Sequence, residues 1–108
     1  AMTVRKDLDP SEGRCRRIGV FLPAGTETPV EVYELLKPED ESEITNEHVQ
    51  TFEAAVDAFI DGAWDDAIDL LSEMPARDRA KDFLLLQIAS HHYEPPDDWD
   101  GVVRLKAK

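Results

Sequence analysis

Residues 52–68 read FEAAVDAFIDGAWDDAI, and this stretch decides the fold. Apolar residues from Phe52 to Phe59 recur at the three- and four-residue spacing of an amphipathic helix. Gly62 predicts the end of that helix, because glycine adopts the left-handed conformation of a helix C-terminus at little cost. Two aspartates follow Trp64 and suit the positive end of a second helix dipole. The stretch therefore predicts two helices joined by a glycine turn.

The sequence before this stretch predicts where the first helix begins. Thr45 is a good N-cap, because its hydroxyl can accept a hydrogen bond from a free N–H of the first turn. Ile44 and Val49 occupy the two positions of a hydrophobic staple around that cap. We therefore expect the first helix to start directly after Thr45.

The sequence after this stretch predicts a third helix. We expect the second helix to carry Met74 on its apolar face and to end at Pro75, since proline cannot continue a helix. A third helix is expected from about Asp78, and the prolines after Tyr93 break it. Residues 99–105 (WDGVVRL) then predict a short extended segment that can form a strand.

The N-terminal third of the chain predicts a β-hairpin. Residues 16–22 (RRIGVFL) form one strand candidate, and residues 23–28 form a loop with a glycine. Residues 30–35 (VEVYEL) alternate between apolar and polar, which places Val30 and Val32 on one side of the strand. A lone hairpin is marginal in water, so we expect it to pack on the helices.

The predicted fold class is α+β: an N-terminal β-hairpin, then three helices and a short C-terminal extended segment. The first two helices resemble a tetratricopeptide hairpin, because an aromatic residue follows the turn glycine and alanines allow close approach. We interpret residues 1–2 as a cloning remnant, 3–37 as the hairpin and 38–43 as an acidic linker. Residues 44–108 would form a helical module with the extended segment, in one compact unit with the hairpin.

Composition limits the classes of function. The chain has 108 residues, 42% of them hydrophobic, which suits one small domain with its own core. Its formal net charge of −12 repels phosphate backbones and anionic lipids, so we expect no nucleic-acid or membrane-surface partner. No apolar run is long enough to span a bilayer, and no signal peptide is recognised. The single Cys15 fits a reducing compartment, and we expect a cytoplasmic location.

Four segments, in order, resemble one protein family. They are Pro29–Leu36 (PVEVYELL), Phe52–Ala55 (FEAA), Gly62–Ala67 (GAWDDA) and Pro95–Val102 (PPDDWDGV). In this order they resemble the closing hairpin and helical tail of bacterial class III adenylate or guanylate cyclases. The resemblance covers roughly residues 29–108. It implies that this chain is the C-terminal part of such a cyclase.

The same resemblance implies that the chain itself is not an enzyme. The metal-binding aspartates, the purine-reading side chains and the transition-state residues of these cyclases all lie before the closing hairpin. No position here matches any of them. We therefore expect no catalytic, cofactor-binding or metal-binding residue and no cofactor in this chain. The parent protein would be the cyclase, a phosphorus–oxygen lyase.

Three histidines and one cysteine are candidates for metal binding or catalysis. His91 and His92 are adjacent, so on a helix they point about 100° apart and do not readily share a metal ion. A position at a helix end, near the negative end of the dipole, is the simpler interpretation. His48 falls in a first turn and is expected to be exposed. Cys15 has arginines beside it that can lower a thiol pKa, but no partner constellation marks it as a nucleophile.

The sequence contains two further candidate binding features, a group of carboxylates and a pair of tryptophans. Asp65, Asp66 and Asp69 could collect a cation, but they lack the glycine and terminal glutamate of a calcium loop. A solvated helix face is the preferred interpretation. Trp64 and Trp99 are interpreted as core anchors and not as platforms for a ligand.

Two functions remain open from the sequence. The chain is either a structural or regulatory appendage of a cyclase, or a free-standing tetratricopeptide-like module that binds a protein segment in its groove. Its partner would be the rest of the parent cyclase, another protein, or a second copy of the chain. The packing of the hairpin distinguishes the two functions. If the hairpin packs in one core with the helices, the chain can be a self-sufficient module. If the hairpin leaves one apolar face open, it belongs to a larger sheet.

Overall fold

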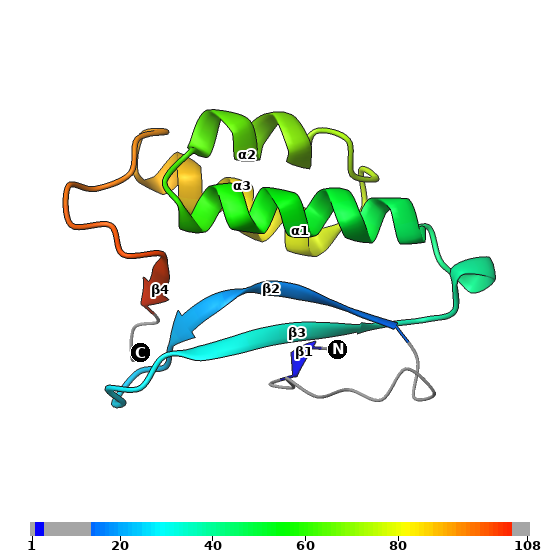
Figure 1. The fold of residues 1–108 in the computed structure, drawn as a ribbon, viewed down its shortest axis with the longest axis horizontal. Helices are drawn as coiled ribbons and strands as arrows, with labels where there is room; N and C mark the ends of the chain where they lie inside the picture. Colours follow the sequence, from blue (N-terminus) through cyan, green and yellow to red (C-terminus); the bar gives the residue numbers. More distant parts are fainter. Residues whose placement is uncertain (1, 4–13, 105–108) are drawn as a thin grey trace.

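The computed structural model describes residues 2–3 and 14–104. It confirms the α+β class, with a hairpin, three helices and a short C-terminal strand (Figure 1). The helical hairpin, the third helix and the terminal strand all lie where the sequence predicted them. The elements in chain order are β1 (Met2–Thr3), β2 (Arg14–Leu22), β3 (Val30–Leu36), the 3-10 turn η2 (Glu39–Glu41), α1 (Asn46–Ile60), α2 (Trp64–Leu71), α3 (Arg79–Ser90) and β4 (Val102–Arg104).

The sheet has the strand order β1-β3-β2-β4. β2 and β3 form the antiparallel hairpin, and β1 adds to the other edge of β3. β4 returns from the far end of the chain and pairs with β2 in parallel. The strand β1 was not predicted, because Met2 was set aside with residues 1–2; in the structure Met2 pairs with Glu34. Residues 10–13 (PSEG), whose composition predicts a turn, lie outside the described residues, as does Leu105, the end of the predicted extended segment.

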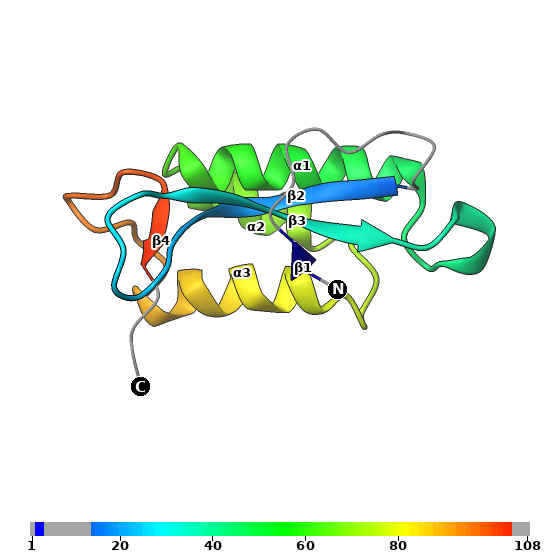
Figure 2. The same ribbon diagram turned by 90° about the horizontal axis from the view of Figure 1, so that it is seen from below.

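The three helices cover one face of the sheet in two levels. α1 and α3 lie nearer the strands, and α2 lies on their far side (Figures 1 and 2). Among the residues that the structure describes, no helix is long and apolar enough to cross a membrane.

A β-bulge sets which side chains of β2 face the helices. The register between β2 and β3 shifts between Arg17 and Gly19. Side chains on one face of a strand normally recur every second residue, and the extra residue breaks this rule. Arg16, Ile18 and Phe21 are therefore all buried, although Ile18 and Phe21 are three residues apart. The bulge gives the strand both a charged and an apolar contact with the helical layer.

The ends of α1 follow the predicted signals, with one correction. Thr45 caps the helix by accepting a hydrogen bond from the His48 backbone N–H at 3.1 Å. His48 is not simply exposed as predicted: its Nδ1 accepts from the Thr45 backbone N–H at 3.0 Å. The imidazole thus replaces the usual glutamate of a capping box. At the other end, Gly62 has φ +83° and ends the helix as expected.

α2 is shorter than predicted. It ends at Leu71, and Met74 lies in the turn after it. The backbone N–H of Met74 donates to the carbonyl of Leu71, so the chain tightens before Pro75. Met74 still packs in the core, at 6% exposure, because the turn directs it inward. Asp78 begins α3 as predicted, and its carboxylate accepts from the backbone N–H of Ala80.

Strands and helices share one core. Residues 38–43 are not a plain linker, because η2 lies within them and the Glu39 carboxylate accepts from the Asn46 backbone N–H at the start of α1. The hairpin is therefore held to the helices directly by packing and by hydrogen bonds. The buried core residues come from β2, α1, α2, α3, β4 and the turn after α2: Ile18, Phe21, Phe52, Ala55, Val56, Phe59, Trp64, Ala67, Leu71, Met74, Ala80, Leu84, Ile88 and Val103.

Candidate functional site

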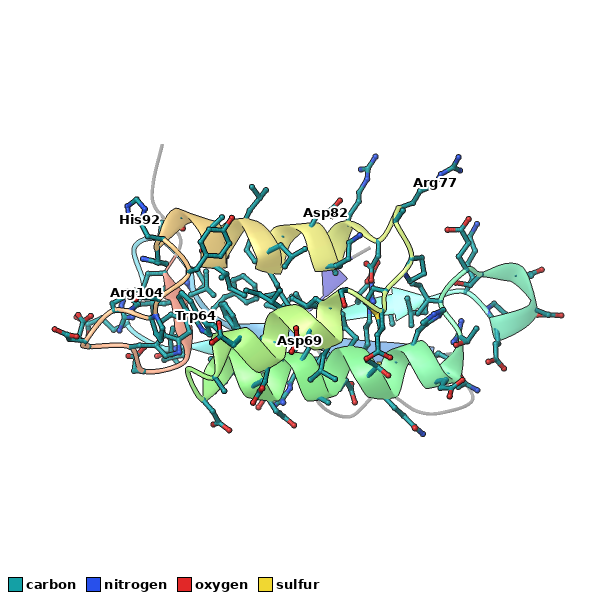
Figure 3. All side chains as sticks on the ribbon, turned by 90° about the horizontal axis from the view of Figure 1, so that it is seen from above. Trp64, Asp69, Arg77, Asp82, His92 and Arg104 are labelled. Atoms are coloured by element: carbon teal, nitrogen blue, oxygen red, sulfur yellow. The ribbon has the colours of Figure 1, made fainter. Side chains whose placement is uncertain are left out.

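The histidines predicted at the end of the third helix lie just beyond it. His91 is the C-cap of α3, and His92 follows it with φ +57°. The two side chains therefore do not lie on one helix face. The His91 ring packs 5.8 Å from the Trp64 ring, while His92 projects away from the body of the molecule (Figure 3).

The predicted aspartates and cysteine occupy separate places. Asp65, Asp66 and Asp69 are all exposed on α2, and Asp69 is on the face turned away from the sheet (Figure 3). Within residues 2–3 and 14–104, no group of three or more histidine, cysteine or carboxylate side chains is arranged to hold a metal ion. Cys15 lies half-buried on β2, opposite Leu35 of β3. The structure does not gather these candidates into one site.

Trp64 and Trp99 act as core anchors, as predicted. Trp64 is 2% exposed, and its ring stacks on Phe59 with centroids 5.5 Å apart. Trp99 meets both rings edge-on, at 5.2 Å from Phe59 and 5.3 Å from Trp64. The indole N–H of Trp99 donates to the carbonyls of Phe59 and Ile60, both at 3.1 Å. This aromatic cluster (Phe59, Trp64 and Trp99) pins the segment that leads into β4 onto the end of α1.

A buried charge cluster, which sequence reasoning missed, joins the hairpin to α3. We call it the Arg16 tie: Arg16 of β2, Glu34 of β3 and Asp78 at the N-cap of α3. Nη1 and Nη2 of Arg16 donate to the two carboxylate oxygens of Asp78 at 2.9 and 2.7 Å. Nε and Nη2 also donate to Oε1 of Glu34 at 2.9 and 2.7 Å. One guanidinium thus binds a carboxylate of the sheet and a carboxylate of the helical layer.

The surroundings of the Arg16 tie explain its charge state. Burial disfavours the charged guanidinium, but the hydrogen bonds to Asp78 and Glu34 outweigh it and raise the pKa of Arg16. The guanidinium carbon also lies 4.3 Å from the centroid of the Phe52 ring. Asp78 accepts from Arg16 and from two backbone N–H groups, those of Ala80 and Lys81. Arg16 therefore stays charged in the interior, and the helix cap and the ion pair depend on the same carboxylate.

One signal in the sequence could have revealed the tie. Glu34 continues the inward-facing positions Val30 and Val32 on β3, so a charge was placed on the covered face of the sheet. A carboxylate on a covered face needs a partner, and Arg16 is its direct neighbour across the hairpin. The third member, Asp78, could not be predicted, because it is far from Arg16 and Glu34 in the sequence.

A second missed feature is an apolar surface groove between α2 and α3. This helical groove has a volume of about 550 Å³. Leu86 and Tyr93 in its wall are 67% and 61% exposed, so both offer apolar area to a partner at the same groove. Its lining residues are Ile68, Asp82, Leu85, Leu86, Ala89 and Tyr93.

An acidic hollow of about 370 Å³ adjoins the helical groove at Tyr93. Three exposed carboxylates lie along it: Asp65 and Asp66 in the first turn of α2, and Glu94 after α3. Tyr93 lines both depressions, so the two are neighbours on the surface. The surface thus presents an apolar strip followed by negative charge, an arrangement that suits an amphipathic protein segment.

Comparisons with known proteins found no match: no family model, no curated protein and no solved structure is similar to this chain.

Proposed function

We propose that this chain is a non-catalytic structural and regulatory module from the C-terminal end of a class III nucleotide cyclase. The four sequence segments described above support the relationship. The chain itself carries no cyclase activity in this proposal. The hairpin β2–β3 closes the sheet of the catalytic domain, and the helices are attached to it.

The observation that carries the regulatory part is the rigid connection between hairpin and helices. The core is continuous from β2 to α3, and the Arg16 tie bonds Glu34 on the sheet to Asp78 on the helical layer. A displacement of α3 therefore changes the energy of the hairpin. A partner that binds the helices can shift the population of catalytic-domain conformations through this connection.

A direct test begins with the coding sequence before Thr3. A preceding domain with paired metal-binding aspartates supports the proposal, and its absence removes the cyclase part of it. In the parent enzyme, Arg16→Met should change the rate of cyclic nucleotide formation, with Arg104→Gln as an exposed arginine control that leaves the hairpin attached. The purified chain, given ATP or GTP with Mg²⁺ or Mn²⁺, should form no cyclic nucleotide above background.

A second candidate function is a free-standing protein-interaction module with a tetratricopeptide-like helical hairpin. The shared core favours it, because the hairpin buries Ile18 and Phe21 against the chain's own helices. By the criterion stated for the hairpin, this packing supports a self-sufficient module. The helical groove with its exposed Leu86 and Tyr93 favours the same candidate.

A further inference from the structure

We infer that the helical groove and the acidic hollow together bind a basic amphipathic segment of another protein. Apolar side chains of that segment would cover Leu86 and Ile68, and its lysines or arginines would lie at Asp65, Asp66 and Glu94. The inference rests on the interaction role of the helices proposed above. It does not depend on the relationship to cyclases.

The apolar half of the surface is built by one stripe of α3. Asp82, Leu85, Leu86 and Ala89 follow the spacing that places side chains on one side of a helix. Leu86 is the most exposed large apolar side chain among the described residues. A helix or extended segment laid along this stripe would remove Leu86 from water, which is the usual source of affinity at such a groove.

The position of Tyr93 adds a second argument. His92 and Tyr93 both have positive φ, +57° and +67°, although neither is glycine. Such backbone is disfavoured for side chains with a Cβ atom, and a glycine at the His92 position would relieve it. The Tyr93 N–H donates to the Ile88 carbonyl at 2.9 Å and so turns the chain back over the end of α3. This turn places the exposed Tyr93 side chain where the groove and the hollow meet.

The negative charge around the groove and the hollow indicates which kind of segment binds there. The hollow beside Tyr93 is lined by Asp65, Asp66 and Glu94, and the groove itself contains Asp82. The whole chain carries a formal net charge of −12, so a second copy would be repelled at long range. An acidic segment or an anionic lipid surface would be repelled too. A basic segment gains both attraction on approach and carboxylate partners after docking.

The charges also orient the segment. Three carboxylates, Asp65, Asp66 and Glu94, lie at the Tyr93 end, whereas the first turn of α3 at the other end carries Arg79 and Lys81 as well as Asp82. The basic residues of the segment would therefore extend past Tyr93 toward the start of α2. Its apolar residues would lie over the middle of α3.

The inference is tested with a fluorescein-labelled peptide and the full chain. The peptide carries leucines at positions i, i+3, i+4 and i+7 of a helix and lysines at one end. Two controls have the same length: an isomer whose leucines are spread around the helix, and a version with glutamates in place of the lysines. We expect saturable binding of the first peptide by fluorescence anisotropy, and at least about tenfold weaker binding of both controls.

Two substitutions locate the binding surface. Leu86→Ala should weaken binding about tenfold, in the range of a central apolar contact. Leu35→Ala is the matched control, because Leu35 is an exposed leucine on the sheet, at 41%, away from the groove. Replacing Asp65, Asp66 and Glu94 by Asn, Asn and Gln should weaken binding at low salt and reduce its dependence on salt. Thermal unfolding of each variant confirms that it is folded.

Three results would overturn the inference. The first is no saturable binding, or equal binding of the scrambled or acidic peptide. The second is unchanged affinity in Leu86→Ala. The third is a dimer in sedimentation that Leu86→Ala dissociates, which would make a second copy the occupant. None of these results bears on whether the hairpin belongs to a cyclase, because that proposal is tested by the coding sequence before Thr3.

Discussion

Two of the contacts that fix the helical layer to the rest of the molecule work by opposite means. At the Arg16 tie a guanidinium and two carboxylates are bonded together, with Arg16 only 2% exposed. At the aromatic cluster, Trp64 stacks on Phe59 and is also 2% exposed. Burial of apolar rings is favourable by itself, whereas burial of charge is favourable only while every partner is present.

This difference affects how each region can be used. The aromatic cluster tolerates partial substitution, since a smaller ring still buries apolar surface. The Arg16 tie has a specific set of partners: within the residues that the structure describes, no buried side-chain nitrogen or oxygen atom lacks a hydrogen-bond partner. Loss of one member therefore leaves a buried charge, and the connection between hairpin and α3 fails as a unit.

The largest loss of stability is expected when the aromatic cluster is disrupted. Trp64→Ala should lower the free energy of unfolding by about 3–5 kcal/mol, because it removes a buried ring and leaves a cavity. It also removes the indole N–H, which donates to the Phe59 carbonyl at 3.0 Å. Urea unfolding followed by circular dichroism measures the change. Trp64→Phe, which keeps an aromatic ring, should lose clearly less; a near-wild-type curve for Trp64→Ala would contradict the buried position.

The second-largest loss of stability is expected when the Arg16 tie is disrupted. Arg16→Met should cost about 3 kcal/mol, because it leaves the buried Asp78 carboxylate without its cation. Asp78→Ser removes the charge but keeps a hydroxyl that can cap α3, and it should cost a similar amount by leaving Arg16 partly unpaired.

The double variant sharpens this comparison. Arg16→Met with Asp78→Ser should cost roughly 2 kcal/mol less than the sum of the two single changes, because no charge of the pair is left behind. Costs that simply add would show that the two side chains are not coupled. Glu34→Gln is the milder control, since the Glu34 side chain is 27% exposed.

Two glycine-to-alanine substitutions test how firmly the aromatic cluster holds the start of β4. Gly101 precedes β4 with φ +85°, and a Cβ there would lie 2.7 Å from Cγ2 of Ile60. Gly25, in the hairpin loop, has φ +79° and no atom within 4 Å of an added Cβ. Both alanine variants bear the backbone cost of about 1 kcal/mol. Gly101→Ala should lose about a further 1–2 kcal/mol through overpacking, measured by urea unfolding; equal losses would show that β4 moves freely.

The sequence predicted the aromatic cluster and the elements around it better than the Arg16 tie. Local signals sufficed for the former: Gly62 ends α1, Trp64 begins α2, and apolar spacing marks Phe59 as buried. The tie depends on a bulge after Arg17 and on the meeting of Asp78 with Arg16, which only the tertiary fold brings together. His48 was misjudged for a related reason, because its role lies in a cap geometry that a glutamate usually supplies.

The candidate surface was the least predictable part. Asp65, Asp66 and Asp69 were correctly interpreted as a solvated helix face, and the helical groove beside them went unrecognised. The apolar residues of α3 surround the helix so broadly that no side was singled out. Leu84 is buried and Leu86 is exposed, although they are only two residues apart and have the same chemistry. The tertiary packing around α3 decides between them.

The smallest expected effect concerns an exposed ion pair, which provides the counterpart of the buried Arg16 tie. Hydrogen bonds from Arg104, and then from the Val102 backbone N–H, lower the pKa of Asp100 from 3.8 to about 2. Because the folded pKa is the lower one, the stabilisation is present above the unfolded pKa. It is lost as the pH falls from about 4 to about 2.

The side-chain carboxyl carbon of Asp100, followed by NMR during acid titration, reports this pKa directly. We expect a midpoint near 2 in the wild type and a higher midpoint, nearer 3.8, in Arg104→Gln. Because both side chains are exposed to solvent, the unfolding midpoint at neutral pH should hardly change. An Asp100 midpoint that does not respond to Arg104→Gln would show that the pair is not formed in solution. A large loss of stability would instead make this exposed pair comparable to the Arg16 tie, and burial would no longer explain the difference between them.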